Sequence, residues 1–204
     1  LICEIVFNSN GEINSYKFFE AQIRSFKRFT YNEIENNKIK ESNIFDSIES
    51  LKKLTNILLQ NKTQRNALAI ESTEPHINID DVGNILDIST PKRLFAHQMI
   101  EESMIAANIC AAKFLKKHYG FGVYRVHEEP ESLKIENLKK FFSLKGHSNK
   151  KNLSTLNLIN SLIRHANKNE NNKLLNILIL QSLKRAQYSS KQIGHFGLQL
   201  KEYS

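Results

Sequence analysis

The hydrophobic pattern at the start of the chain is typical of β-strands. Residues 2 to 7 are β-prone and are followed by Asn-Ser-Asn-Gly at residues 8 to 11, which is a strong tight-turn signal. A second β-prone segment covers residues 13 to 23. This pattern predicts an N-terminal β-hairpin.

The spacing of apolar positions then changes to a helical period. Thr30 can cap a short helix that begins at Tyr31. A second, amphipathic helix is predicted to end near Lys62, because its inward positions recur at helical spacing. These positions are Ile44, Ile48, Leu51, Thr55 and Leu58.

Short strand-like segments precede the best-defined element of the sequence. They cover residues 67 to 71, 76 to 80 and 85 to 88, and the last two are joined by turn residues. Thr90-Pro91 is an N-cap followed by Pro at the first helical position, and the helix that it opens can run to Tyr119, where Gly120 supplies the stop. Four alanines between residues 106 and 112 let neighbouring backbones approach, so this helix is expected to be central.

The remainder of the chain is mostly helical. We expect a strand at residues 123 to 126, helices at 133 to 144, 153 to 166 and 173 to 186, and a strand-like end at 198 to 203. The predicted fold class is therefore α+β: a mixed sheet flanked by helices, one long central helix, and a helical, basic C-terminal third. No repeat interrupts this order, which favours one continuous unit.

Positive charge is concentrated in the last third of the chain. Residues 1 to 136 carry 17 basic and 19 acidic side chains, whereas residues 137 to 204 carry 12 basic and 2 acidic ones. Such a block is typical of a polyanion-binding surface, because Lys and Arg that neutralise phosphates release counterions. A solvated helical surface in a Lys-rich protein explains the charge equally well, and both interpretations stay open.

The two cysteines and the apolar runs indicate the compartment. Cys3 and Cys110 are far apart in the sequence, and we interpret them as buried thiols of a reducing compartment, by default the cytoplasm. The longest apolar runs are far shorter than a membrane span of about twenty residues. The chain begins with Leu1 directly in strand-like sequence, and we expect it to be an internal piece of a longer protein.

The long helix carries polar residues where a core helix should be apolar. His97, Glu101 and Asn108 fall on one stripe. A carboxylate on a largely buried helix is costly unless it is paired or faces water. The residues alone favour an internal ion pair of Glu101, with Arg93 or Arg125, over a ligand site.

Other motifs do not disclose a reaction. We find no metal-binding His or Cys pattern, no phosphate-binding Gly-rich loop and no nucleophile elbow. Gly194-His195-Phe196-Gly197 can present a histidine, although two glycines around an aromatic residue more often mark a tight bend.

Several segments in order nevertheless resemble a known family, the catalytic RNB domain of the ribonuclease R and ribonuclease II 3′ to 5′ exoribonucleases. The segments are Cys3-Glu4-Ile5, Tyr16-Lys17-Phe18-Phe19-Glu20-Ala21, Thr30-Tyr31, Ile100-Glu101-Glu102-Ser103-Met104-Ile105-Ala106-Ala107-Asn108, Tyr124-Arg125-Val126-His127-Glu128-Glu129-Pro130, Leu183-Lys184-Arg185-Ala186-Gln187-Tyr188 and Gly194-His195-Phe196-Gly197-Leu198. Arg125 and the segment around Arg185 favour the ribonuclease R branch.

The resemblance implies an enzyme that hydrolyses single-stranded RNA processively to nucleoside monophosphates with two divalent metal ions, Mg²⁺ or Mn²⁺. The family's metal-binding aspartate cluster belongs upstream of Leu1, and its Thr-Ser-Pro-Ile-Arg motif belongs just after Ser204. Residues 1 to 204 are therefore expected to be the middle of an RNB domain, with no catalytic residue and no metal ligand, and to be inactive alone. The alternative is a non-catalytic RNA-binding or interaction module left by gene splitting or decay.

What the resemblance assigns to this chain is the surface that holds the RNA. Tyr31 matches a tyrosine that stacks near the 3′-terminal nucleotide, and Glu101 matches a glutamate that contacts the terminal ribose. Ile70 occupies a position where relatives often place a phenylalanine that clamps the stacked bases. His97, Asn108 and His195 complete the predicted RNA-binding set. We expect a monomer, with single-stranded RNA as partner and no membrane association.

Overall fold

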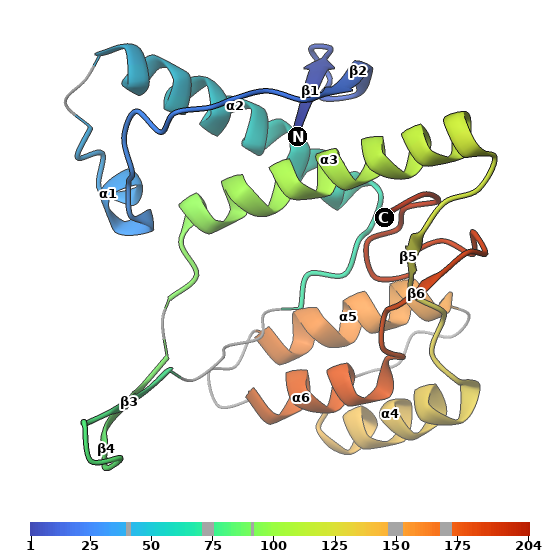
Figure 1. Ribbon diagram of the computed structural model, residues 1–204. Coiled ribbons are helices and arrows are strands. Elements are labelled where there is room, and N and C mark those ends of the chain that lie inside the picture. Colours follow the sequence, from blue (N-terminus) through green and yellow to red (C-terminus); the bar gives the residue numbers. More distant parts are fainter. Residues whose placement is uncertain (40–41, 71–75, 91, 147–152, 168–172) are drawn as a thin grey trace. The chain divides into compact units, whose positions relative to one another are not determined.

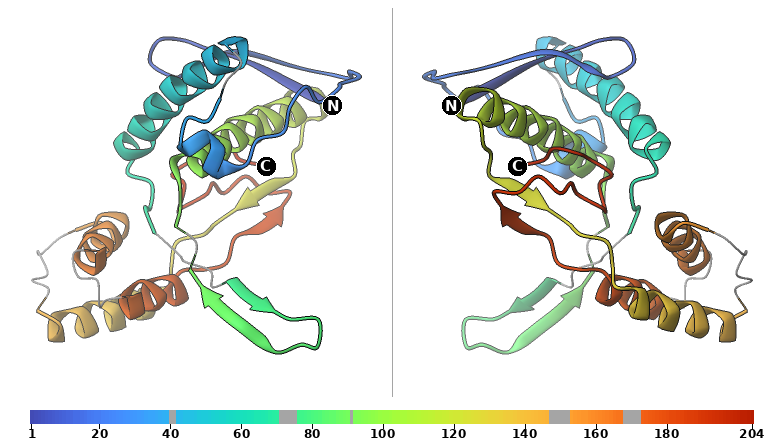
Figure 2. Two further views of the ribbon diagram at one scale, coloured as in Figure 1. Left: turned by 90° about the vertical axis from the view of Figure 1, so that its left-hand side faces the viewer. Right: turned by 90° about the vertical axis from the view of Figure 1, so that its right-hand side faces the viewer.

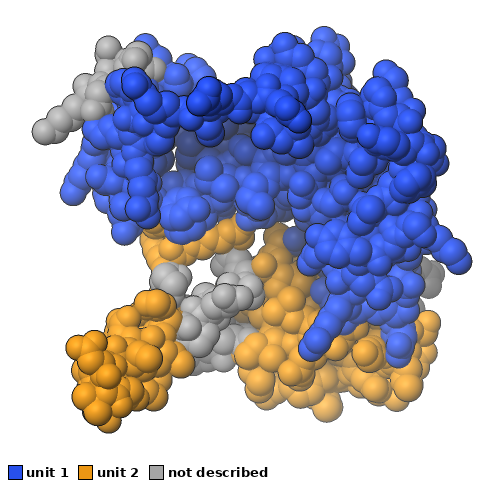
Figure 3. All heavy atoms as spheres, in the orientation of Figure 1, with its two compact units in different colours: residues 1–68, 95–131, 183–204 blue, residues 69–94, 132–182 orange. Residues whose placement is uncertain are grey.

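The structure is a computed structural model that describes residues 1–39, 42–70, 76–90, 92–146, 153–167 and 173–204. The chain divides into two compact units (Figure 3), one of residues 1–68, 95–131 and 183–204, and one of residues 69–94 and 132–182. Both helices and strands are present, so the predicted α+β class is confirmed.

The first unit begins with the predicted hairpin. β1 (Ile2–Phe7) pairs antiparallel with β2 (Ile13–Phe19), which ends four residues before the predicted limit. Gly11 in the turn has a φ of 74°, and a Cβ built there would lie 2.6 Å from the side chain of Ile57. A glycine is needed at this turn both for its left-handed backbone and for the close approach.

Three helices of this unit follow, as the capping residues and the apolar spacing predict. In α1 (Tyr31–Glu35), the Thr30 hydroxyl accepts from the backbone N–H of Glu33, whose carboxylate accepts from the backbone N–H of Thr30. This reciprocal capping box defines the start of a very short helix. α1 and α2 (Ser42–Gln64) both contact α3 (Phe95–Tyr119). The three helices are labelled in Figure 1.

The long helix α3 ends at the predicted residue but begins later than expected. Gly120 has a φ of 75° and its N–H donates to the carbonyl of Lys116, which closes the helix. The N-terminus is at Phe95, whereas we expected it at Pro91, which lies outside the described residues. Glu35 of α1 accepts from the N–H of Ala96, so a residue distant in sequence takes over the capping that Thr90 was expected to provide.

The small residues of α3 line the core of the first unit. Ala96, Ala106, Cys110 and Ala112 are buried on this helix. Cys3 of β1 lies next to Cys110, and the two thiols are within hydrogen-bonding distance. Both are free thiols; Cys110 is buried as predicted, whereas Cys3 is only half-buried. Burial raises the pKa of Cys110 to about 12, so this thiol is protonated and inert at neutral pH.

The last part of the first unit differs most from the prediction. β5 (Tyr124–Val126) is the expected strand, but it pairs with β6 (Gln187–Ser189), which we did not predict. Residues 198 to 203, expected as a strand, form turns with an isolated bridge at Leu200. One physical reason is that Gln199 has a φ of 54°, which interrupts an extended backbone.

The second unit contains a hairpin and a helical cluster. β3 (His76–Ile79) pairs antiparallel with β4 (Ile85–Ser89). α6 (Lys173–Ser182) contacts both α4 (Ser132–Leu144) and α5 (Thr155–Asn167). The three helices, in yellow to orange-red, form one group in Figure 2. The core of this cluster consists of fully buried apolar side chains, among them Phe142, Leu158, Ile159, Leu162 and Ile179.

In the part of the chain that the structure describes, the strands form three separate two-stranded antiparallel sheets, where we expected one mixed sheet. A parallel bridge between His127 and His195 is the parallel element that the described residues contain. Residues 67 to 70 are not a strand either, and Glu71, the end of that predicted strand, lies outside the described residues. Among the described residues, no helix has the length and apolar character that crossing a membrane requires.

Candidate functional site

Two of the predicted site residues stack on each other at the junction of α1 and α3. The ring of Tyr31, the first residue of α1, lies 4.0 Å from the ring of His97 at an interplanar angle of 25°. Glu35, at the other end of α1, holds the first turn of α3 through the N–H of Ala96. Tyr31 is 45% exposed, so a rigidly placed aromatic surface is accessible at this point of the unit.

The ion pair predicted for Glu101 is present, and the partner shown is Lys62 of α2. Lys62 Nζ lies 2.9 Å from Glu101 Oε1 and 2.9 Å from Glu102 Oε1. The side chain of Glu102 is 3% exposed and that of Glu101 is 37% exposed. Arg125, which we considered as a partner, instead lies over the ring of Tyr188.

Lys62 and Glu102 were missed by the sequence reasoning. Lys62 continues the stripe of inward positions that includes Thr55 and Leu58, and a lysine on such a stripe needs a buried counter-charge. That signal was available in the sequence. The identity of the partner of Lys62 was not available in the sequence, because Glu101 and Glu102 lie on a different helix.

A second group forms further along α3. Asn108 Nδ2 donates to the hydroxyl of Tyr203 over 3.2 Å, and the ring of Tyr203 meets the ring of His195 edge to face, with centroids 5.6 Å apart. His97 and Asn108 are eleven positions apart, which is about 16 Å along a helix axis. The predicted stripe is therefore divided between two groups, one around Tyr31 and His97 and one around Asn108 and His195.

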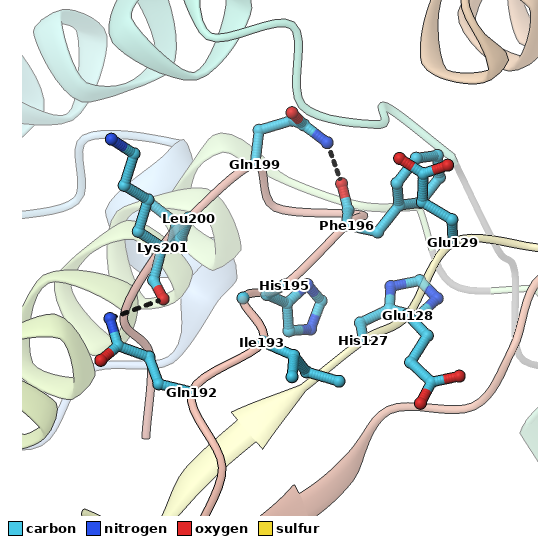
Figure 4. A pocket seen from close by; sticks show the side chains of 11 residues that line it. His127, Glu128, Glu129, Gln192, Ile193, His195, Phe196, Gln199, Leu200 and Lys201 are labelled. Carbon is cyan, nitrogen blue, oxygen red and sulfur yellow. Dashed lines mark hydrogen bonds between the residues drawn. The ribbon is translucent and has the colours of Figure 1, made fainter.

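His195 also belongs to a pair of histidines that lines a cavity of about 660 Å³. The rings of His127 and His195 are 5.0 Å apart and nearly perpendicular, and Figure 4 shows them side by side. The Nδ1 of His127 accepts from the N–H of Gly197, and the Nδ1 of His195 accepts from the N–H of Leu198, each over 3.1 Å. Each neutral ring must therefore carry its proton on Nε2.

The electrostatics of the cavity keep both histidines neutral. Burial is the main cause that lowers the pKa of His195 to about 4, and the neighbouring His127 and Arg125 contribute to this shift. Burial also lowers the pKa of His127. At neutral pH the pair offers N–H donors without a positive charge.

The Gly-His-Phe-Gly segment is the tight bend that its composition indicates. Gly194 has a φ of 84°, and a Cβ built on Gly197 would lie 3.0 Å from the Nδ1 of His127. The bend is tied to the end of α2, because Arg65 Nε donates to the carbonyl of Leu198 and the N–H of Leu68 donates to the carbonyl of Gly197. The bend and the last turn of α2 are thus held together.

The remaining predicted residue lies in the second unit. Ile70 is half-buried in the segment that follows α2 and belongs to neither group. In the described part of the chain, no three His, Cys, Asp or Glu side chains are grouped so that they could hold a metal ion. We therefore derive no chemical step through a metal from these residues.

Comparison with known proteins identifies the class. The model of the RNB domain family matches residues 1–204, so the chain belongs to the RNB domain family. It is similar to ribonuclease R of Buchnera aphidicola subsp. Schizaphis graminum, with 34% identity over 100% of this chain and 29% of that protein. The predicted resemblance is confirmed.

Solved structures agree with the sequence comparison. The chain matches Mycoplasma genitalium ribonuclease R in complex with ribose methylated single-stranded RNA, with a TM-score of 0.83, 25% identity, and coverage of 99% of this chain and 33% of that one. It also shares its fold with yeast Ssd1, a pseudonuclease, at a TM-score of 0.61 and 18% identity over 96% of this chain and 25% of that one. The chain thus spans about a third or less of each of these relatives.

Proposed function

We propose that this chain forms the RNA-holding part of a 3′ to 5′ exoribonuclease that hydrolyses single-stranded RNA processively to nucleoside monophosphates. The observation that carries the proposal is the stack of Tyr31 on His97, which holds an accessible aromatic ring in place on two helices. An aromatic platform of this kind binds bases of any sequence, at about 1 to 3 kcal/mol per stacked base. The membership of this chain in the RNB domain family and its similarity to an RNA-bound ribonuclease R support this function.

The predicted residues take different parts in this proposal. Tyr31 stacks on the 3′-terminal nucleotide, and His97 supports Tyr31 from behind. Glu101 accepts a hydrogen bond from the terminal ribose 2′-hydroxyl, which distinguishes RNA from DNA. Asn108 and His195 line the path of the preceding nucleotides. Ile70 and the basic last third of the chain are further parts of the RNA-binding surface that the family resemblance predicts.

In this proposal, none of these residues carries out the hydrolysis itself. Bound Mg²⁺ or Mn²⁺ ions would activate the attacking water and stabilise the leaving oxygen. The described residues of this chain bind and orient the RNA instead. The cytoplasmic location and the monomeric state expected from the sequence remain predictions.

The alternative is a non-catalytic RNA-binding module. The fold that the chain shares with yeast Ssd1 is the reason to test this alternative, because Ssd1 is a pseudonuclease. The two functions differ in what the chain does inside a working enzyme.

The experiment that separates them is a segment exchange. The 204 residues replace the corresponding segment of Mycoplasma genitalium ribonuclease R, and the chimaera is incubated with 5′-labelled poly(A) and Mg²⁺ or Mn²⁺. We expect metal-dependent shortening from the 3′ end by the chimaera and none by the isolated chain. A folded chimaera that binds poly(A) without shortening it would favour the non-catalytic module. Shortening by the isolated chain would contradict the proposal that these residues bind RNA but do not hydrolyse it.

Replacing Tyr31 tests the stacking role. In the chimaera, Tyr31→Ala should leave overall RNA affinity nearly intact, because phosphate contacts supply most of it, but should change the length of the final undegraded oligonucleotide. The measurement is a sequencing gel of the end products, with Tyr119→Ala as a matched control at an exposed tyrosine of α3. Identical end products for Tyr31→Ala and the unmodified chimaera would leave Tyr31 without a stacking role.

A further inference from the structure

Lys62 occupies an unusual position between two adjacent carboxylates. Its Nζ lies 2.9 Å from Oε1 of Glu101 and 2.9 Å from Oε1 of Glu102. The Lys62 side chain is 16% exposed, so the ammonium is largely removed from water. A lysine ammonium has three donors, and two of them are directed at these carboxylates.

The two carboxylates differ in burial, and they therefore have different roles in the cluster. Glu102 is almost completely enclosed, and a buried charge requires a partner. The pairing with Glu102 therefore fixes where the ammonium lies. The more accessible Glu101 is in turn held by an ammonium whose position is already determined.

The backbone that carries Lys62 is fixed as well. Asn66, with a φ of 61°, ends α2, while the N–H of Ala67 donates to the carbonyl of Lys62 and the N–H of Asn66 donates to that of Thr63. This pair of bonds is a Schellman motif, in which Lys62 provides the first carbonyl. Arg65 in the same turn donates to the carbonyl of Leu198, so the end of α2 is held from a second side.

We infer that Lys62 is a positioning residue for Glu101, and that it sets the selectivity of the site for a ribose that carries a 2′-hydroxyl. This inference rests on the proposed function, in which Glu101 receives the terminal ribose. A carboxylate can accept about four hydrogen bonds, so pairing with Lys62 leaves capacity for a hydroxyl donor. A carboxylate that is fixed before the substrate binds discriminates better than one that must first be ordered.

The test uses the ribonuclease R chimaera and two substrates that differ in one atom. One is an all-RNA oligonucleotide, and the other has a single 2′-deoxy residue at its 3′ end. The readout is the ratio of kcat/KM for the two substrates. Lys62→Met should lower this ratio about three- to tenfold, whereas Lys62→Arg, which can still bridge both carboxylates, should keep most of it.

Removing Lys62 takes the paired ammonium away from the buried Glu102 and can unfold the unit. The double variant Lys62→Met with Glu102→Gln removes both buried charges and should show the same loss of selectivity in a folded protein. Lys53→Met, at an exposed lysine of α2, is the matched control and should not change the ratio.

Glu101→Ala separates the inference from the function on which it rests. A loss of selectivity in Glu101→Ala together with a normal ratio in the folded Lys62 double variant would overturn the positioning role and leave the proposed function intact. A normal ratio in Glu101→Ala would overturn the ribose-binding role of Glu101, and the inference with it. A lower ratio in both, with no further decrease when Lys62→Met is added to Glu101→Ala, supports the inference.

Discussion

Glu101→Ala should reduce the discrimination between RNA and DNA by about one to two orders of magnitude. The variant removes the acceptor of the proposed hydrogen bond from the terminal 2′-hydroxyl, and a hydrogen bond to a charged group contributes about 1.5 to 3 kcal/mol. Glu101→Gln keeps the shape and one acceptor oxygen, so its effect should be milder. The measurement is the ratio of RNA to DNA oligonucleotide binding and turnover by the ribonuclease R chimaera.

A matched control separates this effect from the loss of an ordinary ion pair. Glu49 of α2 pairs with Lys52 and has a side-chain exposure of 36%, against 37% for Glu101, so Glu49→Ala removes a similar pair outside the site. Thermal melts accompany each variant. If the Glu101 variants lower the melting temperature while the RNA to DNA ratio stays unchanged, Glu101 is structural and serves only as a partner of Lys62.

Local chemistry explains why the helices could be predicted. The capping box at Thr30 and Glu33 is formed by residues three positions apart, and the end of α3 depends on Gly120 and its own backbone. Both features are read directly from neighbouring residues. The start of α3 was predicted wrongly because Glu35, which caps it, comes from another helix.

The parts of the site that the sequence did not reveal depend on contacts between distant segments. Lys62 and Glu102 are 40 positions apart, and His127 and Gly197 are 70 apart. The pattern of residues 198 to 203 suggests a strand. However, Arg65 Nε donates to the carbonyl of Leu198, and the N–H of Leu68 donates to the carbonyl of Gly197. A backbone whose hydrogen bonds go to another element does not extend a sheet.

The family resemblance and the geometry contributed different things. The resemblance named Tyr31 and Glu101 individually, and the structure adds the residue that holds each of them, His97 for the ring and Lys62 for the carboxylate. Sequence reasoning placed His97, Glu101 and Asn108 on one stripe. Because α3 is long, the stripe serves two separate groups of contacts.

The two paired histidines, His127 and His195, should make the protein sensitive to mild acid. His195 has a pKa of about 4 in the folded chain against an ordinary value of 6.5, so the unfolded chain binds a proton between these pH values and the folded chain does not. Stability is therefore fully present above pH 6.5 and is lost as the pH falls toward 4. By pH 5 the loss from His195 should be about 2 kcal/mol, measured as the free energy of unfolding in urea.

His195→Asn is the variant that tests this cause. Its amide oxygen can still accept from the N–H of Leu198, as Nδ1 of His195 does, but the amide does not titrate. The variant should lose about 2 kcal/mol less than the unmodified chain between pH 7.5 and pH 5, and any remaining loss is expected from His127, whose pKa burial also lowers. Glu202 interferes little in this window, because pairing with Lys116 lowers its pKa, so its contribution is lost only in stronger acid. Equal losses in the two proteins would show that His195 is already protonated in the folded state at pH 5, and that its ring is not held neutral by burial.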